Sequence, residues 1–532
     1  MLLNDFDLKN IDENYINSVD IDTLRKLSRK LLEDLKEARE QINQNPKNSS
    51  RPPSSVEPWI KAEIEDDEEE IEFDGKINFN KNKSSSSSDD SNQDREDIEK
   101  NAKKEKKKDS TNKRKAGKQE GAKGVGRTQN IPVTETIKHI PEECSVCGGK
   151  LNEENFKPKT GHYVIDINMG DEDNPGIIIT NTKHIYGDTI CTCGHINHTE
   201  PYRCEKEEDW DVELTEWHLV GPNLMALICC LAMRMRLSRK KIREFLNDWL
   251  HLSLAIGTIN QCIHEAGRAC EPLEEQLLEE LRKAHLVFAD ETSWKEKGIP
   301  YWLWAFKTAR TALFTISHRT KETVEQILGD FSGWLMSDGY NAYRYYINRL
   351  RCWAHLTRKA EGISESLNIE AQKFGEEVLN VLNSFMEAVY EARKGSFENL
   401  KIKYKDHLER FSVVCKEFKD FAHNKDGKIY EKTQALAREF LNDWEAIFRV
   451  LEHPELPLTN NEVERILRHW VILRRICYGT KTKQGSRVLA LLASVIETCR
   501  LRNILPWPYL SKVISNRRKG IRSPPIPNAV II

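Results

Sequence analysis

The chain has 532 residues, of which 31% are charged and 39% are hydrophobic, and this length allows three or four domains at roughly 100–200 residues per domain. The 81 Lys and Arg residues nearly balance the 84 Asp and Glu residues, and the net charge of −3 excludes a globally basic chain, so any contact with nucleic acid must come from local patches. The longest apolar run, from Leu224 to Met233, is shorter than the ~20 residues that span a bilayer, which excludes a membrane protein.

The first residues contain no basic segment that leads into an apolar run, so we expect no secretory signal and a reducing, cytoplasmic location. In that compartment the thirteen cysteines are expected to be metal ligands or buried thiols rather than disulfides.

Residues 1–44 are predicted to form a helical segment. Apolar residues recur at coiled-coil spacing in a charged background, at Leu24, Leu31, Leu35, Ala38 and Ile42. Ser28 interrupts the seam, so a coiled coil and a plain amphipathic helix both fit. Proline and small polar residues end the segment at NPKNSSRPPSS.

Residues 45–132 are predicted to be a disordered linker. Between residues 62 and 130 the aromatic residues are Phe73 and Phe79, and an acidic run, a serine run and a basic run follow one another. Such a segment cannot bury enough apolar surface to offset its ordering entropy. The basic end either contacts DNA phosphates non-specifically or is simply solvated.

Residues 133–208 are predicted to bind zinc. The pair Cys144 and Cys147 has the two-residue gap and the following glycines that let two thiolates bind one tetrahedral Zn²⁺, and a tighter pair, Cys191 and Cys193, follows. We expect a zinc ribbon held by these four thiolates. The alternatives to Cys193 as the fourth ligand are His195, His198 and Cys204.

Residues 209–275 are predicted to contain two short helices with a tight join. Ser238 is placed to cap the first helix, and after a turn at Gly257, Thr258 is placed to cap the second, which runs through Ala269. This pattern fits a DNA-binding helix-turn-helix and also a generic helical hairpin. The candidate DNA contacts on the first helix are Arg239, Lys240, Lys241 and Arg243.

Residues 276–360 are predicted to begin a mixed α/β core. Three strands of aromatic and β-branched residues, a helix and a fourth strand are expected at 285–290, 301–307, 311–318, 321–331 and 333–338, with a possible fifth strand over 351–356. The first and fourth strands end in Asp290 and Asp338. This β-β-β-α-β order is typical of a ribonuclease-H-like core.

In such a core the first and fourth strands are neighbours, so Asp290 and Asp338 are expected to meet. Carboxylates bind Mg²⁺, and two ions ~3.5–4 Å apart can stabilise the attacking and leaving oxygens of phosphoryl transfer. Glu291 points to the opposite face of the strand, so only one of the two adjacent acids can serve.

A third acid is expected from a helix in the second part of the core, residues 453–502, with Thr459 or Asn460 at its N-cap. Glu462 and Glu464 lie about 200° apart around that helix, and periodicity does not choose between them. A basic strip for phosphates, or a solvated helix face, follows at Arg465, Arg468, Arg474 and Arg475. Residues 361–452 are predicted to be a helical insertion, and residues 503–532 a C-terminal tail.

These blocks together resemble the transposases of the insertion-sequence-66 family, the TnpC-type proteins, nearly end to end. The resembling motifs are Asn48-Ser-Ser-Arg-Pro-Pro-Ser-Ser, the paired cysteines, Asp290-Glu-Thr, Ser337-Asp338-Gly-Tyr-Asn-Ala-Tyr, Cys352-Trp-Ala-His355 and Asn460-Asn461-Glu-Val-Glu464-Arg. The Cys-x-Cys spacing of the second pair departs from the family's commoner Cys-x-x-Cys.

The resemblance implies a DDE transposase with Asp290, Asp338 and Glu464 as its acids, because the family's asparagine pair is followed, after two residues, by Glu-Arg. It also implies a supporting role for His355, two Mg²⁺ (or Mn²⁺) ions, structural Zn²⁺ and a nucleoid-associated location. The implied partners are double-stranded DNA at element ends and target, a second copy of the chain in at least a dimer, and accessory proteins of the element.

Two other functions remain open from the sequence. One is a catalytically silent DNA-binding protein, either a domesticated transposase or a repressor of its own element. The other is a coiled-coil scaffold, which would leave the aromatic strands around Asp290 and the paired cysteines without a purpose.

Overall fold

The computed structural model describes Tyr15 and residues 18–43, 131–170, 173, 176–204, 209–366, 368–395, 399–419 and 431–528. The chain divides into two units, Met1–Gly126 and Arg127–Ile532. The linker predicted at 45–132 lies outside the described residues as far as residue 130, as does the tail beyond residue 528.

The first unit contains helix α3 (Ile21–Asn43). Asp20 begins it, because its Oδ1 atom accepts the N–H groups of Asp22 and Thr23 at 2.9 Å. Of the predicted seam, Leu31 and Leu35 are exposed, and the side chains of residues 38 and 42 lie outside the described residues. The helix predicted over this segment is therefore present, and its self-association stays a prediction.

The second unit begins with a four-stranded sheet built around a long hairpin. Strand β3 (Ile177–Ile190) pairs antiparallel with β2 (Phe156–Met169) and β4 (Ile196–His198), and parallel with β1 (Glu135–Lys138). The hairpin is fixed to the helices below it because the Asp166 carboxylate accepts the N–H of Leu224, 2.7 Å away, in the first turn of α5.

Four helices follow the hairpin: α5 (Pro222–Met233), α6 (Arg239–Leu250), α7 (Ile256–Cys270) and α8 (Leu273–Arg282). The Ser238 hydroxyl accepts the N–H of Lys241, which confirms the predicted cap of α6. The predicted cap of α7 is wrong, because this helix begins at Ile256 and has Ala255, not Thr258, at its N-cap. Helix α7 packs against α5, α17 and α18.

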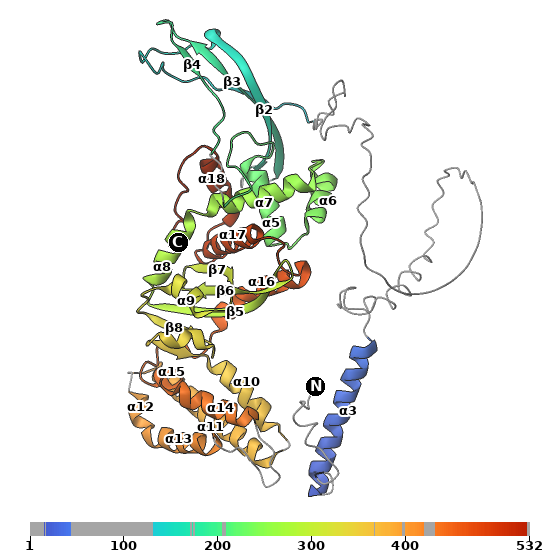
Figure 1. The fold of residues 1–532 in the computed structure, drawn as a ribbon, viewed down its shortest axis with the longest axis vertical. Helices are drawn as coiled ribbons and strands as arrows, with labels where there is room; N and C mark the ends of the chain where they lie inside the picture. Colours follow the sequence, from blue (N-terminus) through green and yellow to red (C-terminus); the bar gives the residue numbers. More distant parts are fainter. Residues whose placement is uncertain are drawn as a thin grey trace, which may run out of the picture. The chain divides into compact units, whose positions relative to one another are not determined.

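A five-stranded sheet forms the centre of the second unit, in the order β7-β6-β5-β8-β9 (Figure 1). The first three pair antiparallel, whereas β5, β8 and β9 pair in parallel. Helix α9 (Lys321–Leu328) connects β7 to β8, so the predicted β-β-β-α-β order is present. The strands are β5 (Leu286–Glu296), β6 (Ile299–Lys307), β7 (Ala312–Ser317), β8 (Trp334–Ser337) and β9 (Arg349–Arg351).

Two strand predictions need correction. Strand β5 does not end at Asp290 but continues beside β6 to Glu296, because Thr292 and Trp294 carry on its pairing with β6. The predicted fifth strand ends at Arg351, and His355 lies in helix α10 (Trp353–Ser364). The buried residues of that helix recur at helical spacing. The six residues 351–356 are too few for their sequence to distinguish helical from strand periodicity.

Helices α10 to α15 form a separate layer with a hydrophobic core of its own (Figure 1). The chain is helical here, as the charged amphipathic pattern predicts. The further helices are α11 (Ile369–Ala392), α12 (Leu400–Lys403), α13 (Lys405–Lys419), α14 (Glu431–Asn442) and α15 (Trp444–Phe448).

Helix α16 (Asn461–Cys477) runs along β5 and is attached to it at both ends. At its start the Asn460 side chain donates to the carbonyl of Ala289 (2.9 Å), and after its end the N–H of Thr480 donates to the carbonyl of Lys295 (2.9 Å). Helix α17 (Lys483–Leu501) packs on β7, and α18 (Pro506–Arg518) packs on α5. The sheet and α16 are therefore fixed relative to each other.

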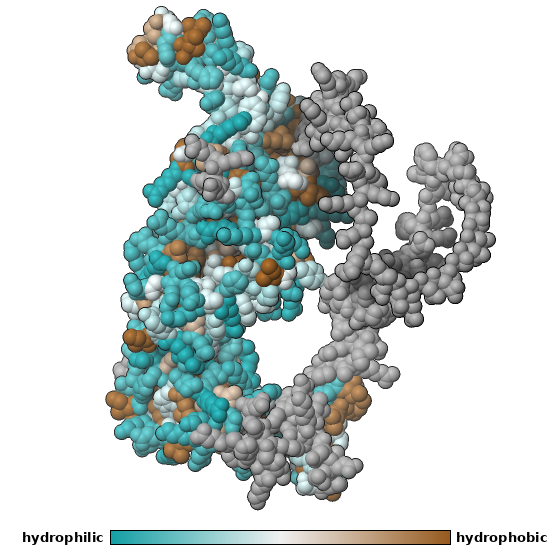
Figure 2. Space-filling view, in the orientation of Figure 1, coloured by the Kyte–Doolittle hydropathy of each residue, from teal (hydrophilic) through white to brown (hydrophobic). Residues whose placement is uncertain are grey.

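On the face drawn in Figure 2, hydrophilic side chains predominate and the hydrophobic ones form small, separate patches. Among the described residues, no helix combines the length and apolar character needed to cross a membrane.

Candidate active site and metal centres

Asp290 and Asp338 lie just beyond the same end of the parallel pairing between β5 and β8, although β5 itself continues beside β6 to Glu296. The last residues that β5 and β8 pair in register are Phe288 and Met336, and each acid follows two positions later. Because the two strands are parallel, this register places both acids at the same end of the pairing.

The surroundings of Asp290 are strongly negative. Burial raises the pKa of Asp290 well above its usual range, and the charges of Glu291, Asp338 and Glu464 raise it further. The charges of Asp338 and Glu464 thus both contribute to the raised pKa of Asp290.

The attachment of α16 to β5 brings Glu464 to this environment. Glu464 lies about 6 Å along the helix from Asn460, at 1.5 Å per residue. Asp290 lies about 3.3 Å along the strand from Ala289, which the Asn460 side chain contacts. The hydrogen bond between Asn460 and Ala289 thus anchors both acids, since Glu464 and Asp290 each lie a short distance along the chain from it.

Glu464 itself is incompletely paired. Its Oε1 atom is buried and has no hydrogen-bond partner. Two basic side chains lie near it: the Nε2 atom of His355 is 3.7 Å from Oε1, and the guanidinium of Arg358 is 3.8 Å from Oε2. Glu462, the alternative third acid, instead accepts the Lys307 ammonium at 2.9 Å on another side of the helix.

Glu291 forms hydrogen bonds with side chains that are distant in the sequence. It is buried and accepts two hydrogen bonds from the Arg319 guanidinium, at 3.0 and 2.7 Å, and one from the Tyr343 hydroxyl at 2.7 Å. Arg319 in turn lies over the rings of Trp302 (4.3 Å) and Tyr340 (4.0 Å). Only the aromatic enrichment of these strands could have pointed to this network.

His355 contacts the third acid from a helix rather than from a strand. Together with Cys352, it forms a group with Glu464 in which one ligand atom of each residue lies within 4.8 Å of the others. Asp290 and Asp338 are not part of that group. Burial lowers the pKa of His355, and the charge of Glu464 opposes that shift.

A polar cavity of about 430 Å³ opens beside Asp338, between the sheet and helix α14. Its basic lining residues are Arg319, Arg344, Lys359 and Arg438. They come from separate segments of the chain, so no local sequence pattern could have grouped them.

The chemistry of these acidic side chains suits divalent cations. Asp290 is buried among negative charges, and Glu464 Oε1 has no donor, so the protein leaves negative charge uncompensated there. Carboxylate oxygens are the ligands that Mg²⁺ and Mn²⁺ prefer.

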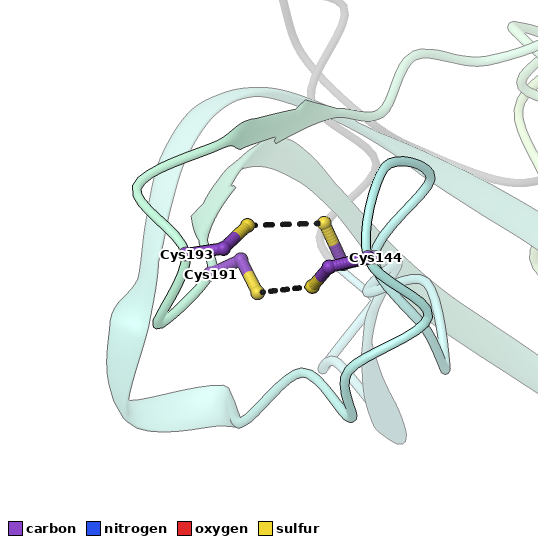
Figure 3. A group of neighbouring side chains, drawn as sticks. Cys144, Cys191 and Cys193 are labelled. Carbon is purple, nitrogen blue, oxygen red and sulfur yellow. Dashed lines mark hydrogen bonds between the residues drawn. The ribbon is translucent and has the colours of Figure 1, made fainter.

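The paired cysteines form a second possible metal centre. All four sulfur atoms lie within 4.8 Å of one another, with 3.8 Å between Cys144 and Cys193 and 3.5 Å between Cys147 and Cys191 (Figure 3). Sulfurs bound tetrahedrally at about 2.3 Å from Zn²⁺ would lie about 3.8 Å apart. The cluster is therefore consistent with structural zinc.

The local backbone favours the thiolate form of Cys144 and shapes the two turns that carry the cysteines. The N–H groups of Cys147 and Val146 lower the pKa of the Cys144 thiol to about 6, which favours the thiolate that binds metal. Gly148 and Gly194 have φ values of +67° and +86°, a left-handed conformation that favours glycine in each knuckle.

The three alternative zinc ligands have other partners. The Nε2 atom of His195 lies 3.1 Å from the Ser145 hydroxyl, and the Nδ1 atom of His198 lies 2.7 Å from a carboxylate oxygen of Asp188. The sulfur of Cys204 accepts a hydrogen bond from Arg268 at 3.7 Å.

The basic residues of α6 differ in exposure. Lys240, Lys241 and Arg243 are exposed, whereas Arg239 is partly buried and its guanidinium donates to Asn260 at 3.4 Å. Helix α7 is buried over most of its length, so the exposed cations of this helix pair belong to α6.

The basic residues of α16 also divide into exposed residues and one that contacts a neighbouring element. Arg465, Arg468 and Arg475 are exposed along the helix that carries Glu464, although Arg465 also lies 3.6 Å from Glu462. Arg474 donates to the Thr292 hydroxyl at 2.8 Å, so it holds α16 against β5.

Comparison with known proteins gives two family matches. The model described as "Transposase IS66 family" matches residues 218–488, a range that includes all three acids, and a model for a family of unknown function matches residues 7–75.

Similar curated proteins include three from Sinorhizobium fredii. The uncharacterized protein y4qI is 24% identical over 306 residues, covering 52% of this chain and 55% of that protein. The uncharacterized protein y4jD is 25% identical over 282 residues (47% and 53%), and y4hP is 24% identical over 334 residues (56% and 59%). The chain spans only a little over half the length of these relatives.

Proposed function

The chain belongs to the IS66 transposase family, and from this premise we propose that it binds the terminal inverted repeats of its insertion sequence and catalyses DNA cleavage and strand transfer there. In this proposal Asp290, Asp338 and Glu464 are the catalytic acids of a DDE-type enzyme. Membership of the IS66 transposase family does not depend on these residue assignments.

A ribonuclease-H-like core is the fold that we propose for the catalytic part. The strand order β7-β6-β5-β8-β9 and the change from antiparallel to parallel pairing at β5 support it. Within the chain, residues 276–360 and 453–502 would form this core, and residues 361–452 the helical insertion.

The three acids would hold two Mg²⁺ or Mn²⁺ ions. When bound, these ions neutralise phosphate charge and assist in-line displacement at phosphorus. Asp290 and Asp338 would bind from the sheet, and Glu464 from α16. The rigid attachment of α16 to β5 at Ala289 and Lys295 supports this assignment, since it holds the third acid in register with the first.

His355 and Arg358 would orient the Glu464 carboxylate. Both contact it from α10, at 3.7 and 3.8 Å, without forming a close ion pair. Such long contacts leave the carboxylate able to turn toward a cation. The Glu291–Arg319 pair would keep β5 and the chain after Asp338 rigid, because Arg319 lies over Tyr340.

DNA would contact the exposed cations beside the acids. Arg465, Arg468 and Arg475 on α16, and Lys240, Lys241 and Arg243 on α6, have the exposure that phosphate contacts require. The cavity beside Asp338, with its four basic lining residues, would accept the DNA backbone close to the scissile bond. Arg239 and Arg474 would act structurally.

The remaining parts would serve assembly. The four cysteines would bind structural Zn²⁺ in a zinc ribbon, α3 would pair with a second copy of the chain, and accessory proteins of the element would join the complex. Paired element ends favour at least a dimer.

The observation that carries the proposal is the parallel register of β5 and β8, which brings Asp290 and Asp338 to the same end of this pairing, while the charge of Glu464 contributes to the raised pKa of Asp290. The test is incubation of the full chain with labelled element ends and Mg²⁺, followed by mapping of the 3′ ends. New 3′-OH ends at the element boundary support the proposal. Specific end binding without any cleavage would indicate the silent DNA-binding protein instead.

A further inference from the structure

A second group of metal-ligating side chains lies at the edge of the proposed active site. Cys352, His355 and Glu464 each offer one ligand atom, and these atoms lie within 4.8 Å of one another. Cys352 and His355 are three residues apart at the start of α10, and Glu464 comes from α16. The group therefore joins two elements that are distant in sequence.

The polar atoms of this group are poorly satisfied. The Oε1 atom of Glu464 and the Nδ1 atom of His355 are both buried and have no hydrogen-bond partner. Buried polar atoms without a partner are uncommon, because each has lost its water without a replacement. Two such atoms in one cluster with a buried thiol indicate a ligand that the three residues share.

The backbone supports the sulfur as a ligand. The Cys352 sulfur is buried and accepts the N–H of Asn460 at 3.2 Å. An N–H donated to sulfur fixes the direction of its lone pairs, as groups around a bound metal commonly do. Asn460 also holds Ala289, so the same residue orients the sulfur and anchors the strand that carries Asp290.

We propose that Cys352, His355 and Glu464 form a second zinc site, separate from the four cysteines. One thiolate, one imidazole and one carboxylate are ligands that suit Zn²⁺, and three protein ligands leave its fourth position open. Mg²⁺ prefers oxygen ligands alone, so the thiol and imidazole discriminate against it.

Zinc at this site opposes the proposed nuclease because Glu464 belongs to both ligand sets. A carboxylate held by Zn²⁺ together with Cys352 and His355 is withdrawn from the magnesium ions. This regulatory consequence rests on the proposed function, whereas zinc binding itself does not. Zn²⁺ thus acts as a reversible inhibitor that competes for the third acid.

The test begins with metal content. The full chain is dialysed against buffered, limiting free Zn²⁺, and bound zinc is measured by elemental analysis. We expect two zinc ions per wild-type chain and one in Cys352→Ser, in which the hydroxyl can still accept the Asn460 N–H. His355→Gln is expected to bind one ion as well. Cys415→Ser, a matched change of a buried cysteine within the helical layer, is expected to bind two.

Co²⁺ substitution gives a second readout that does not depend on activity. The wild-type chain is expected to show absorption from a tetrahedral one-thiolate site in addition to the four-thiolate site, and Cys352→Ser only the latter. Circular dichroism checks that each variant is folded. One zinc ion in the wild type, or two in a folded Cys352→Ser, would overturn the proposal.

A nicking assay then separates this inference from the proposed function. With element ends and Mg²⁺, added Zn²⁺ is expected to lower wild-type nicking at least tenfold, and the ratio of activities with and without Zn²⁺ is expected to approach one in Cys352→Ser. Equal inhibition of both proteins would overturn the regulatory role. A wild type that binds two zinc ions and never nicks would refute the proposed function and leave the zinc site standing.

Discussion

Asp443→Asn tests how the helical layer is joined to the central sheet. The Asp443 carboxylate is buried between α14 and α15 and accepts the guanidinium of Arg349 at 2.6 Å and that of Arg344 at 3.1 Å; a third, Arg351, lies 3.5 Å away. Arg349 and Arg351 belong to strand β9, and helix α10 begins two residues after Arg351. Together with Glu439 of α14, which also pairs with Arg351, this carboxylate therefore joins strand β9 to the helical layer.

The expected cost is about 3 kcal/mol of unfolding free energy, the lower end of the 3–5 kcal/mol typical for removing one partner of a buried ion pair. The side chains of Arg349 and Arg351 are 7% and 0% exposed; Arg349 would lose a partner that water cannot replace, whereas Arg351 would keep its ion pair with Glu439. Arg344 is 38% exposed and adds little. Asparagine keeps the shape and one acceptor, which favours the lower figure.

The pH dependence has a defined sign. Burial alone would raise the pKa of Asp443, but the hydrogen bond and charge of Arg349, with the charges of Arg351 and Arg344, hold that pKa below its usual value. A depressed folded-state pKa gives stability that is present above the unfolded pKa of about 3.9 and is lost as pH falls through the folded value. The wild-type advantage should therefore be full at neutral pH and shrink below about pH 4.

Urea unfolding followed by intrinsic tryptophan fluorescence measures this difference. Asp406→Asn, an exposed change on α13, is the control and should stay within about 0.5 kcal/mol of wild type. A cost below about 1 kcal/mol for Asp443→Asn, or a difference that grows toward acid pH, would refute the reasoning.

Glu464→Gln should abolish nicking of element ends, whereas Glu462→Gln, which weakens the contacts of Glu462 with Lys307 and Arg465, should lower it less than tenfold; equal loss in both would contradict the assignment of the third acid. Cys144→Ser should remove the zinc of the four-cysteine cluster, measured by elemental analysis, while Cys204→Ser keeps it. Arg468→Ala and Lys241→Ala should each weaken end binding at all sequences and reduce the slope of log K against log salt by about one unit, as loss of one phosphate contact does. An unchanged slope would remove the residue from the interface.

Much of the central sheet is predictable, because the residue pattern of its longer strands extends over enough positions to indicate a strand. Residues 301–307 and 311–318 are rich in aromatic and β-branched side chains, and β6 and β7 lie within or close to these bounds. The adjacency of β5 and β8 also follows from element order, and the parallel pairing brings corresponding positions of the two strands side by side. Chain order and local pattern suffice for these features.

The rest depends on contacts between distant segments. His355 lies in a helix because Trp353, Leu356 and Ala360 pack into the core of the helical layer. A short segment of sequence does not predict this packing. The partners of Glu291 lie 28 and 52 positions away, so its burial as a paired acid cannot be deduced from its neighbours. Periodicity left Glu462 and Glu464 equivalent, and their surroundings differ through contacts with distant segments, Lys307 beside Glu462 and His355 beside Glu464.

Crystals of the full chain with a DNA end and Mn²⁺ test the central claim most directly, through an anomalous difference map at the manganese edge. The account predicts two manganese peaks bounded by the carboxylates of Asp290, Asp338 and Glu464. Carboxylates that remain apart around the bound DNA, with no manganese between them, would contradict it.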